Sequence, residues 1–376
     1  MSNDPASEQE LAGIRGEIDR IDQQIQELLN RRAACAQRVA EVKKAELLRQ
    51  HGQASDAAQA SFYRPEREAQ VLRRVMDRNA GPLPGKAVAR IFREIMSECL
   101  ALERPMKVAF LGPEGTFTQA ASIKHFGHAV LASSLATIGA VFDAVEAGDA
   151  DYGVVPVENS TEGMVTHTLD NFIRSPLKIC GEVELPIRLH LLGAPGCMPE
   201  RIARICAHQQ ALAQCRGWLD SHWPGVEQSP VSSNGEAARM AASDTSIAAI
   251  AGDLARESYD LVKLASNIQD YADNTTRFLV IGRSAVRPSG RDKTSIIVST
   301  RNRPGALFRL LEPFQREQIM LTRIDTRPSR TETWTYLFFI EFEGHAEDER
   351  IAGVLRELEE HTVMIKTLGS YPQAVV

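Results

Sequence analysis

Three polar segments in the middle of the chain have the residue types of a small-molecule site: Gly112–Thr118, Pro156–Gly163 and Asn274–Phe278. Each adjoins a short apolar run that is typical of a β-strand. Backbone N–H groups and hydroxyls at a helix start, as in Gly112–Thr118, suit a carboxylate. This segment lacks the lysine of a P-loop and the third glycine of a dinucleotide fingerprint, which disfavours nucleotide binding. One such segment alone is more typical of a turn, but three polar strand ends in one α/β region predict a ligand crevice.

A second group of candidate residues is cationic and lies near the start of the chain. Arg32 and Lys43 are 11 residues apart, close to three helical turns, and therefore share a face of the predicted helix. Arg15 lies about 25 Å from Arg32 along this helix, too far to share one small site within a subunit. An antiparallel partner helix would bring Arg15 to the site of the other subunit. A solvated charged face is the alternative for each cation taken alone.

The elements that position these cations are helical. A helix running to about Leu48 is followed by a loop over Gln50–Phe62 and by helices over Pro65–Asn79 and Gly85–Glu103. Its apolar stripe consists of Ile14, Ile18, Ile21, Ile25, Leu28 and Leu29. At about 1.5 Å per residue the helix is a rod of roughly 50–60 Å, which the shorter helices cannot cover. We therefore expect it to pair with a second copy of the chain.

The rest of the chain alternates strands and helices. The middle region predicts an α/β fold with mostly parallel sheets. Its strands are expected at Lys107–Leu111, Tyr152–Val157, Leu189–Leu192, Ile205–Ala207, Ile247–Ala251 and Phe278–Ile281. Gly282–Lys293 has the composition of a linker, and the last region predicts a βαββαβ ferredoxin-like unit. The expected domains are residues 1–104, 105–284 and 292–376.

The composition excludes several classes of protein. The 376 residues are 43% hydrophobic and 24% charged, as in globular multidomain proteins. The net charge of −6 disfavours nucleic acid and anionic membranes as partners. The six cysteines form no Cys-x-x-Cys pair, and no metal or cofactor is expected. The start does not have the pattern of a signal peptide and no apolar run reaches about 20 residues, which predicts a cytoplasmic protein.

The first region resembles the all-helical, dimeric chorismate mutases over residues 7 to about 104, most specifically in the string Tyr63–Glu68. That reaction, chorismate to prephenate, is pericyclic and needs no nucleophile, base or metal. The site has only to hold the chorismate dianion in its reactive chair conformation and to stabilise the negative charge that grows on the ether oxygen. The resemblance implies that Arg15 of the partner subunit and Arg32 hold the carboxylates, that Lys43 donates to the ether oxygen and that Glu68 holds the hydroxyl. The remaining implied contacts are Arg64, Arg67, Cys99 and Glu103.

Three features depart from the better-known mutases. The Gln50–Phe62 loop is longer, Cys99 replaces a small hydroxyl residue and Glu103 replaces glutamine. A carboxylate only accepts hydrogen bonds, so the Glu103 carboxyl must be protonated to help as a catalytic residue. This requires a raised pKa, and mutase activity is therefore expected to fall as pH rises.

The second region resembles the prephenate dehydratases over about residues 106–284. The matching strings are Gly112–Thr118, Val155–Gly163, His208–Cys215 and Thr275–Phe278, with Gln209 where the family usually has proline. The resemblance implies two lobes around a cleft, as in periplasmic binding proteins, and the loss of CO2 and the ring hydroxyl to give phenylpyruvate. Thr276 is predicted to be the essential hydroxyl and Arg277 to anchor a carboxylate. The other predicted contacts are Thr116, Glu158, Asn159, Ser160, Thr275 and Phe278, and His208 is either an acid or a structural residue at a helix start.

The last region, about residues 294–372, resembles ACT regulatory domains. Asn302–Phe308 and Asp325–Pro328 match two phenylalanine-binding motifs, with Asp-Thr in place of Glu-Ser. Gly305 lets a ligand approach the backbone at a helix start. The implied phenylalanine contacts are Gly305, Ala306, Leu307, Phe308, Asp325, Thr326, Arg327 and Pro328. In the family the amino acid lies between two such domains, so regulation also implies a dimer.

In this order the three regions resemble the bifunctional chorismate mutase–prephenate dehydratases of phenylalanine synthesis. The resemblance implies chorismate and prephenate as substrates, phenylalanine as effector and a homodimer or larger assembly. The alternatives are a dehydratase with an inactive mutase domain and a non-catalytic amino-acid sensor. An assay that follows chorismate loss and phenylpyruvate formation separates the three.

Overall fold

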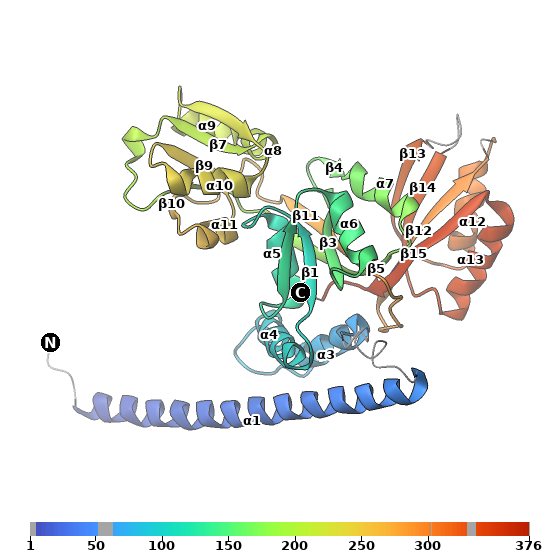
Figure 1. The fold of residues 1–376 in the computed structure, drawn as a ribbon, viewed down its shortest axis with the longest axis horizontal. Coiled ribbons are helices and arrows are strands. Elements are labelled where there is room, and N and C mark those ends of the chain that lie inside the picture. The colour runs from blue at the N-terminus through green and yellow to red at the C-terminus, as the bar shows by residue number, and fades with distance from the viewer. Residues whose placement is uncertain (1–4, 52–62, 302, 329–335, 376) are drawn as a thin grey trace.

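The computed structural model describes residues 5–51, 63–301, 303–328 and 336–375. The first region is helical, as expected: α1 (Pro5–His51), α3 (Pro65–Asp77) and α4 (Gly85–Glu103). Helix α1 has 47 residues and extends as a rod along one side of the molecule (Figure 1). Its apolar stripe is open to solvent: Ile14, Ile18, Ile21, Ile25 and Leu28 are 46–60% exposed. Most of the loop predicted over Gln50–Phe62 lies outside the described residues.

The middle region forms two lobes. The sheet of the first lobe has the strand order β2-β1-β3-β11-β5, with β4 beside β3. Its elements are β1 (Lys107–Leu111), α5 (Phe117–Phe126), β2 (Leu131–Leu135), α6 (Ile138–Ala147), β3 (Tyr152–Asn159), β4 (Gly163–Met164), α7 (Thr166–Arg174), β5 (Lys178–Pro186) and β11 (Thr275–Gly282).

The second lobe has a sheet of order β10-β6-β9-β7-β8. Its elements are β6 (His190–Gly193), β7 (Arg204–His208), α8 (Gln209–Gln214), α9 (Arg216–His222), β8 (Glu227–Val231), α10 (Asn234–Ser243), β9 (Ile247–Ala251), α11 (Asp253–Ser258) and β10 (Val262–Ala265), with a short 3₁₀ turn at Pro199–Arg201.

The expectation of mostly parallel sheets is wrong, because both sheets are mixed. Strand β11 is antiparallel to β3 and to β5. The reason is the chain path: β5 leads into the second lobe and β11 returns from it, so the two strands run in opposite directions. Together they form the connection between the lobes, next to the polar strand ends.

The last region is the expected βαββαβ unit. It consists of β12 (Asp292–Thr300), α12 (Ala306–Arg316), β13 (Leu321–Pro328), β14 (Tyr336–Glu343), α13 (Glu349–His361) and β15 (Met364–Pro372), in the antiparallel order β13-β14-β12-β15. One face of its sheet packs on α12 and α13. The other face shares an apolar core with the first lobe, where Phe339 and Leu368 join Val155 and Leu279. The C-terminal domain is therefore docked directly behind the strands that carry the polar segments (Figure 1).

Helices α3 and α4 are docked on the first lobe as well. The Arg93 guanidinium donates to the Lys124 carbonyl at 2.8 Å, and the Tyr63 hydroxyl lies 3.1 Å from His125 Nε2. Arg73 of α3 donates to the Arg291 carbonyl at 2.9 Å and so touches the segment before β12. Within the described ranges, no helix is both long and apolar enough to cross a membrane.

Candidate active sites

A cleft with about 940 Å³ of empty space lies between the two lobes of the middle region. The predicted residues that line it from the first lobe are Thr116, Asn159, Thr276 and Phe278, and His208 lines it from the second lobe. Among the described lining residues there is no lysine or arginine, and His208 is the one histidine. No cluster of potential metal ligands occurs in the part of the chain that the structure describes.

The strand register separates the predicted residues into two faces. Thr276 of β11 pairs with Asn159 of β3, and the next pair along the strands is Arg277 with Glu158. Because neighbouring side chains on a strand point to opposite faces, one pair faces the cleft and the other faces away from it. Thr276 and Phe278 line the cleft, while Arg277 lines a cavity against the C-terminal domain.

The Thr276 hydroxyl has a defined hydrogen-bond direction. Asn159 Oδ1 accepts the backbone N–H of Thr161 at 3.0 Å, which fixes the orientation of the Asn159 amide. Asn159 Nδ2 then donates to Thr276 Oγ1 at 2.8 Å and to Asn274 Oδ1 at 2.9 Å. A hydroxyl that accepts from Asn159 has its own proton available for a group in the cleft.

The same network crosses to the second lobe. Asn274 Nδ2 donates to Gln214 Oε1 at 3.0 Å, and Gln214 Nε2 lies 3.3 Å from Thr161 Oγ1. Gln214 belongs to α8, so the network ties the cleft residues of one lobe to a helix of the other. Gln214, Asn274 and Thr161 were not among the contacts predicted from the sequence. A signal was present, because Gln214 lies in the matched string His208–Cys215 and Asn274 begins the third polar segment.

Arg277 does not lie in the cleft, contrary to its predicted role as a carboxylate anchor. It is buried and forms ion pairs with Glu182 (2.7 Å) and with Glu341 of the C-terminal domain. Burial alone would lower the pKa of the Arg277 guanidinium, but the Tyr371 hydroxyl and the two carboxylates raise that pKa above its usual value. The physical reason for the error is the alternation of β11, which sends Thr276 and Arg277 to opposite faces.

Three other predicted contacts also do not line the cleft. Glu158 is ion-paired with Arg323 of the C-terminal domain. Ser160 Oγ accepts the backbone N–H of Thr275 at 3.0 Å, so these two residues hold the turn beside the cleft together. All three are corrections to the predicted substrate contacts.

His208 has the structural role considered for it and also lines the cleft. It lines the cleft, and it also caps α8, because Nδ1 accepts the backbone N–H of Gln210 at 3.4 Å. With Nδ1 as an acceptor, the proton of the neutral ring is on Nε2. His208 is therefore fixed at the edge of the cleft with one nitrogen available to a ligand.

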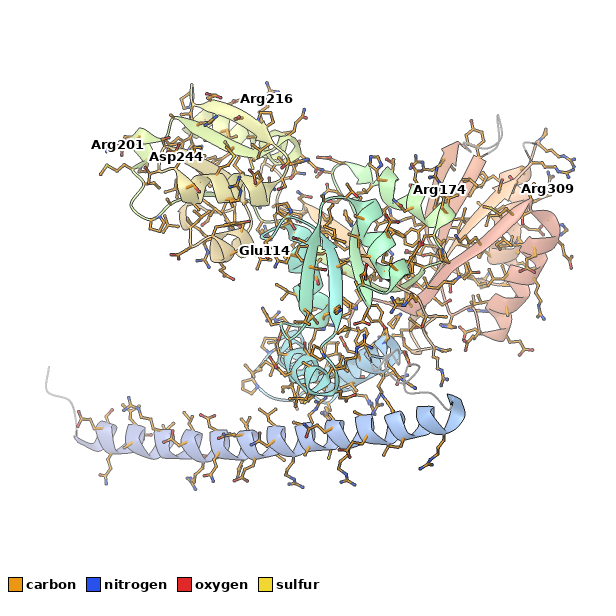
Figure 2. All side chains as sticks on the ribbon, viewed as in Figure 1. Glu114, Arg174, Arg201, Arg216, Asp244 and Arg309 are labelled. Atoms are coloured by element: carbon orange, nitrogen blue, oxygen red, sulfur yellow. The ribbon has the colours of Figure 1, made fainter. Side chains whose placement is uncertain are left out.

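The segment Gly112–Thr118 holds the two lobes together. The Tyr259 hydroxyl of the second lobe donates to the Glu114 carbonyl at 3.3 Å, and Glu114 lies where the lobes meet (Figure 2). Gly115 has φ +76° and lies against Ala255, so a side chain at this position would be strained as well as crowded. The Thr116 hydroxyl donates to the carbonyls of Leu111 and Pro113 and stabilises the turn at the cleft edge.

The structure brings part of the predicted mutase set together. Arg32 of α1 donates to the Ile95 carbonyl of α4 at 3.4 Å. Ile95, Cys99 and Glu103 are four residues apart and so share the face of α4 that α1 covers. Lys43 is half-buried on α1, whereas Arg15 is exposed near its other end. The side chains on α1 project into solvent along most of its length (Figure 2).

Glu68 of α3 lies against a different face of α4 from the one that carries Cys99 and Glu103. Its carboxylate is 3.2 Å from Arg93, and both line a cavity with Lys124 and His125 of the first lobe. Arg93 is six residues from Cys99, or about 120° around the helix. Burial raises the pKa of the Glu68 carboxyl, although Arg93 opposes the shift. The expectation that Glu68 joins the other mutase residues is not met within one chain, and Arg64 and Arg67 are exposed.

The described residues of the two predicted effector segments lie in different surroundings. Gly305 has φ +77° at the start of α12, and Phe308 is 70% exposed. Ala306 lines an open depression of about 1430 Å³ with Arg301, Arg303, Arg309 and His361, at the outer edge of the domain where Arg309 is labelled (Figure 2). On β13, Thr326 is exposed, Arg327 pairs with Asp170 at 3.2 Å, and Asp325 faces the first lobe beside Arg323. Asn302 and the side chain of Pro328 lie outside the described residues.

A helical arm, a two-lobed domain with a polar cleft and a ferredoxin-like regulatory sheet define a multidomain enzyme of small-molecule metabolism. Family models match in the same order: chorismate mutase type II at residues 14–104, prephenate dehydratase at 108–286 and the ACT domain at 294–360. The chain belongs to the family of bifunctional chorismate mutase/prephenate dehydratases. It is 54% identical to that protein of Pseudomonas aeruginosa, over 99% of this chain and 100% of the relative. It is 49% identical to that of Neisseria gonorrhoeae, over 96% and 97% of the two chains.

Solved structures agree over the middle and last regions. Prephenate dehydratase of Arthrobacter aurescens, solved in complex with L-Phe, has a TM-score of 0.66 and 36% identity over 72% of this chain and 93% of that chain. GqqA, described as a novel type of quorum quenching acylase, also has a TM-score of 0.66, with 27% identity over 71% of this chain and 98% of that chain.

Proposed function

We propose that the protein converts chorismate to prephenate in its helical domain and prephenate to phenylpyruvate, CO2 and water in its two-lobed domain, and that phenylalanine regulates it. We assign these steps and their regulation to residues 1–104, 105–284 and 292–376. The single observation that carries the dehydratase assignment is the Thr276 hydroxyl, which Asn159 orients in the cleft. We also assign the protein to the cytoplasm, because its six cysteines are all free.

The dehydratase chemistry fits the residues that line the cleft. Prephenate loses its ring carboxylate as CO2 and its ring hydroxyl as water, and the electron pair of the broken carbon–carbon bond completes the aromatic ring. The departing hydroxyl takes up a proton from solvent and leaves as water; Thr276 and the Nε2–H of His208 donate hydrogen bonds to it. The absence of lysine and arginine among the described lining residues leaves the ring carboxylate without a counter-charge, which favours its loss. The other carboxylate is held by amide and hydroxyl donors.

The mutase site requires a second copy of the chain. The open apolar stripe of α1 needs a partner helix, because a row of large apolar side chains 46–60% exposed is costly in water. An antiparallel partner would carry its Arg15 about 25 Å along the axis to the Arg32 of this chain. There, Lys43, Cys99 and Glu103 complete the set. Light scattering of the purified protein should give at least twice the mass of one chain.

Phenylalanine regulation fits the effector segments. The L-Phe complex of the Arthrobacter aurescens relative supports phenylalanine as the ligand. Because Ala306 lines the outer edge of the domain whereas Asp325 and Arg327 of β13 face the first lobe, we place the amino acid between two C-terminal domains. The exposed Leu307 and Phe308 side chains are available for that contact.

One assay tests the whole proposal. The purified full-length protein is given chorismate and, separately, prephenate, with and without L-Phe. We expect chorismate to be consumed, phenylpyruvate to form from both substrates, and L-Phe to suppress its formation. A sensor would bind L-Phe and consume neither substrate. A protein with an inactive mutase domain would consume prephenate alone.

A further inference from the structure

Two ion pairs connect the C-terminal domain to the back of the two strands that form the dehydratase cleft. Glu158 of β3 directly precedes the cleft residue Asn159 and is paired with Arg323 of β13. Arg277 follows Thr276 on β11, and it is paired with Glu341 of β14. The register places Glu158 opposite Arg277, as it places Asn159 opposite Thr276. The immediate sequence neighbours of Asn159 and Thr276 are therefore held by ion pairs to the C-terminal domain.

Arg323 lies between two carboxylates from different domains. One is Glu158 of the first lobe, and the other is Asp325, which belongs to the predicted effector segment of β13 and lies 3.9 Å away. Asp325 Oδ2 is buried and has no hydrogen-bond partner among the described residues. Burial, together with Glu158 and Glu341, raises the pKa of the Asp325 carboxyl, although Arg323 opposes the shift.

Around Arg277 and Arg323 the carboxylates outnumber the cations, so the carboxylates compete. The cations are Arg277, Lys293 and Arg323, and the carboxylates are Glu158, Glu182, Asp325 and Glu341. Arg277 and Lys293 each form ion pairs with both Glu182 and Glu341. Arg323 is the cation that remains for Glu158 and Asp325. It lines a cavity between the two sheets, and both carboxylates lie beside its guanidinium.

We propose that Arg323 is a positioning residue that links the effector segment to the dehydratase cleft by sharing its guanidinium between Asp325 and Glu158. A ligand that moves β13 changes this sharing, and Glu158 transmits the change to Asn159 and so to the Thr276 hydroxyl. This inference rests on the proposed dehydratase activity and on its regulation by phenylalanine.

The test compares Arg323→Gln with Arg316→Gln in the full-length protein. Arg316 is a matched control, because its ion pairs with Glu312, Glu317 and Glu357 stay within the C-terminal domain. The measured quantity is the ratio of dehydratase kcat/KM without and with saturating L-Phe. We expect this ratio to fall at least about fivefold in Arg323→Gln and to stay at the wild-type value in Arg316→Gln. Calorimetry should still detect L-Phe binding to Arg323→Gln. Retained binding shows that the C-terminal domain of the variant is folded.

Each outcome decides the proposal. A wild-type ratio in Arg323→Gln overturns the link, as does loss of L-Phe binding, because Arg323 would then belong to the effector site itself. An equal loss in Arg316→Gln also overturns it. If Arg323→Gln does not fold, Glu158→Gln removes the same ion pair from the other domain and should give the same loss. If the wild-type protein does not respond to L-Phe, the proposed regulation fails and this inference fails with it.

Discussion

The hydrogen-bond direction at Thr276 allows a prediction that distinguishes two substitutions of Asn159. Because Asn159 Oδ1 accepts the Thr161 N–H, Nδ2 faces the Thr276 hydroxyl at 2.8 Å. Asn159→Asp replaces this donor with an acceptor, and the Thr276 proton is then donated to the new carboxylate instead of into the cleft. Asn159→Ala removes the donor but leaves the Thr276 proton available.

The expected magnitude follows from the loss of one preorganised donor. Such a donor contributes about 10²- to 10³-fold to kcat when it acts on charge that develops in the transition state. We therefore expect Asn159→Asp to lower the dehydratase kcat about 10²- to 10³-fold. In Asn159→Ala the hydroxyl loses one neutral hydrogen bond of about 0.5–1.5 kcal/mol, which corresponds to a loss of roughly tenfold or less. The alanine variant should thus be the more active one, although aspartate is closer to asparagine in size.

The assay is phenylpyruvate formation at saturating prephenate, so that charge repulsion affecting KM is excluded. Thr276→Val serves as the reference, because it removes the hydroxyl at nearly constant shape. Adding Asn159→Asp to Thr276→Val should cost less than about threefold more, since both changes affect the same proton. Unchanged mutase activity checks that each variant is folded. An aspartate variant at least as active as the alanine variant, or losses that multiply in the double variant, would refute this assignment.

Three further predictions concern the other sites. Wild-type mutase kcat/KM should fall as pH rises from about 5 to 8, and Glu103→Gln should flatten the profile and stay active; a flat wild-type profile would contradict a protonated Glu103. Gly305→Val should form phenylpyruvate without responding to L-Phe, because a β-branched residue at φ +77° costs about 1–3 kcal/mol; calorimetry and inhibition curves measure this, and a wild-type response would contradict the predicted effector segment. His208→Ala should lower the dehydratase kcat while mutase activity stays unchanged, because it removes the Nε2–H donor from the cleft, whereas an unchanged kcat would remove His208 as a donor to the departing hydroxyl.

The sequence predicts best the elements with strong apolar patterns. Strands Lys107–Leu111 and Ile247–Ala251 and helix Gly85–Glu103 agree with the structure residue for residue. Strands β2 and β8 were not predicted, since their exposed and polar residues give a weak strand signal. The mixed sheets also escaped prediction, because the direction of β11 depends on a chain path through a whole second lobe.

The candidate site was predicted in part, for a similar reason. Thr276 and Asn159 lie in the cleft as expected. Arg277 belongs to the same sequence string, but its partners Glu182 and Glu341 lie 95 and 64 residues away, and their contact depends on how two domains pack. A matched sequence motif contains all consecutive residues of a strand. The alternation of side chains along the strand then decides which of these residues face the ligand.

The most direct test of the central claim gives chorismate to the wild-type protein and to Thr276→Ala and follows chorismate, prephenate and phenylpyruvate over time. Two activities in separate domains predict that the wild type converts chorismate to phenylpyruvate. Thr276→Ala should consume chorismate at the wild-type rate and accumulate prephenate. If the wild type leaves chorismate unchanged, or if Thr276→Ala still forms phenylpyruvate at the wild-type rate, the account is contradicted.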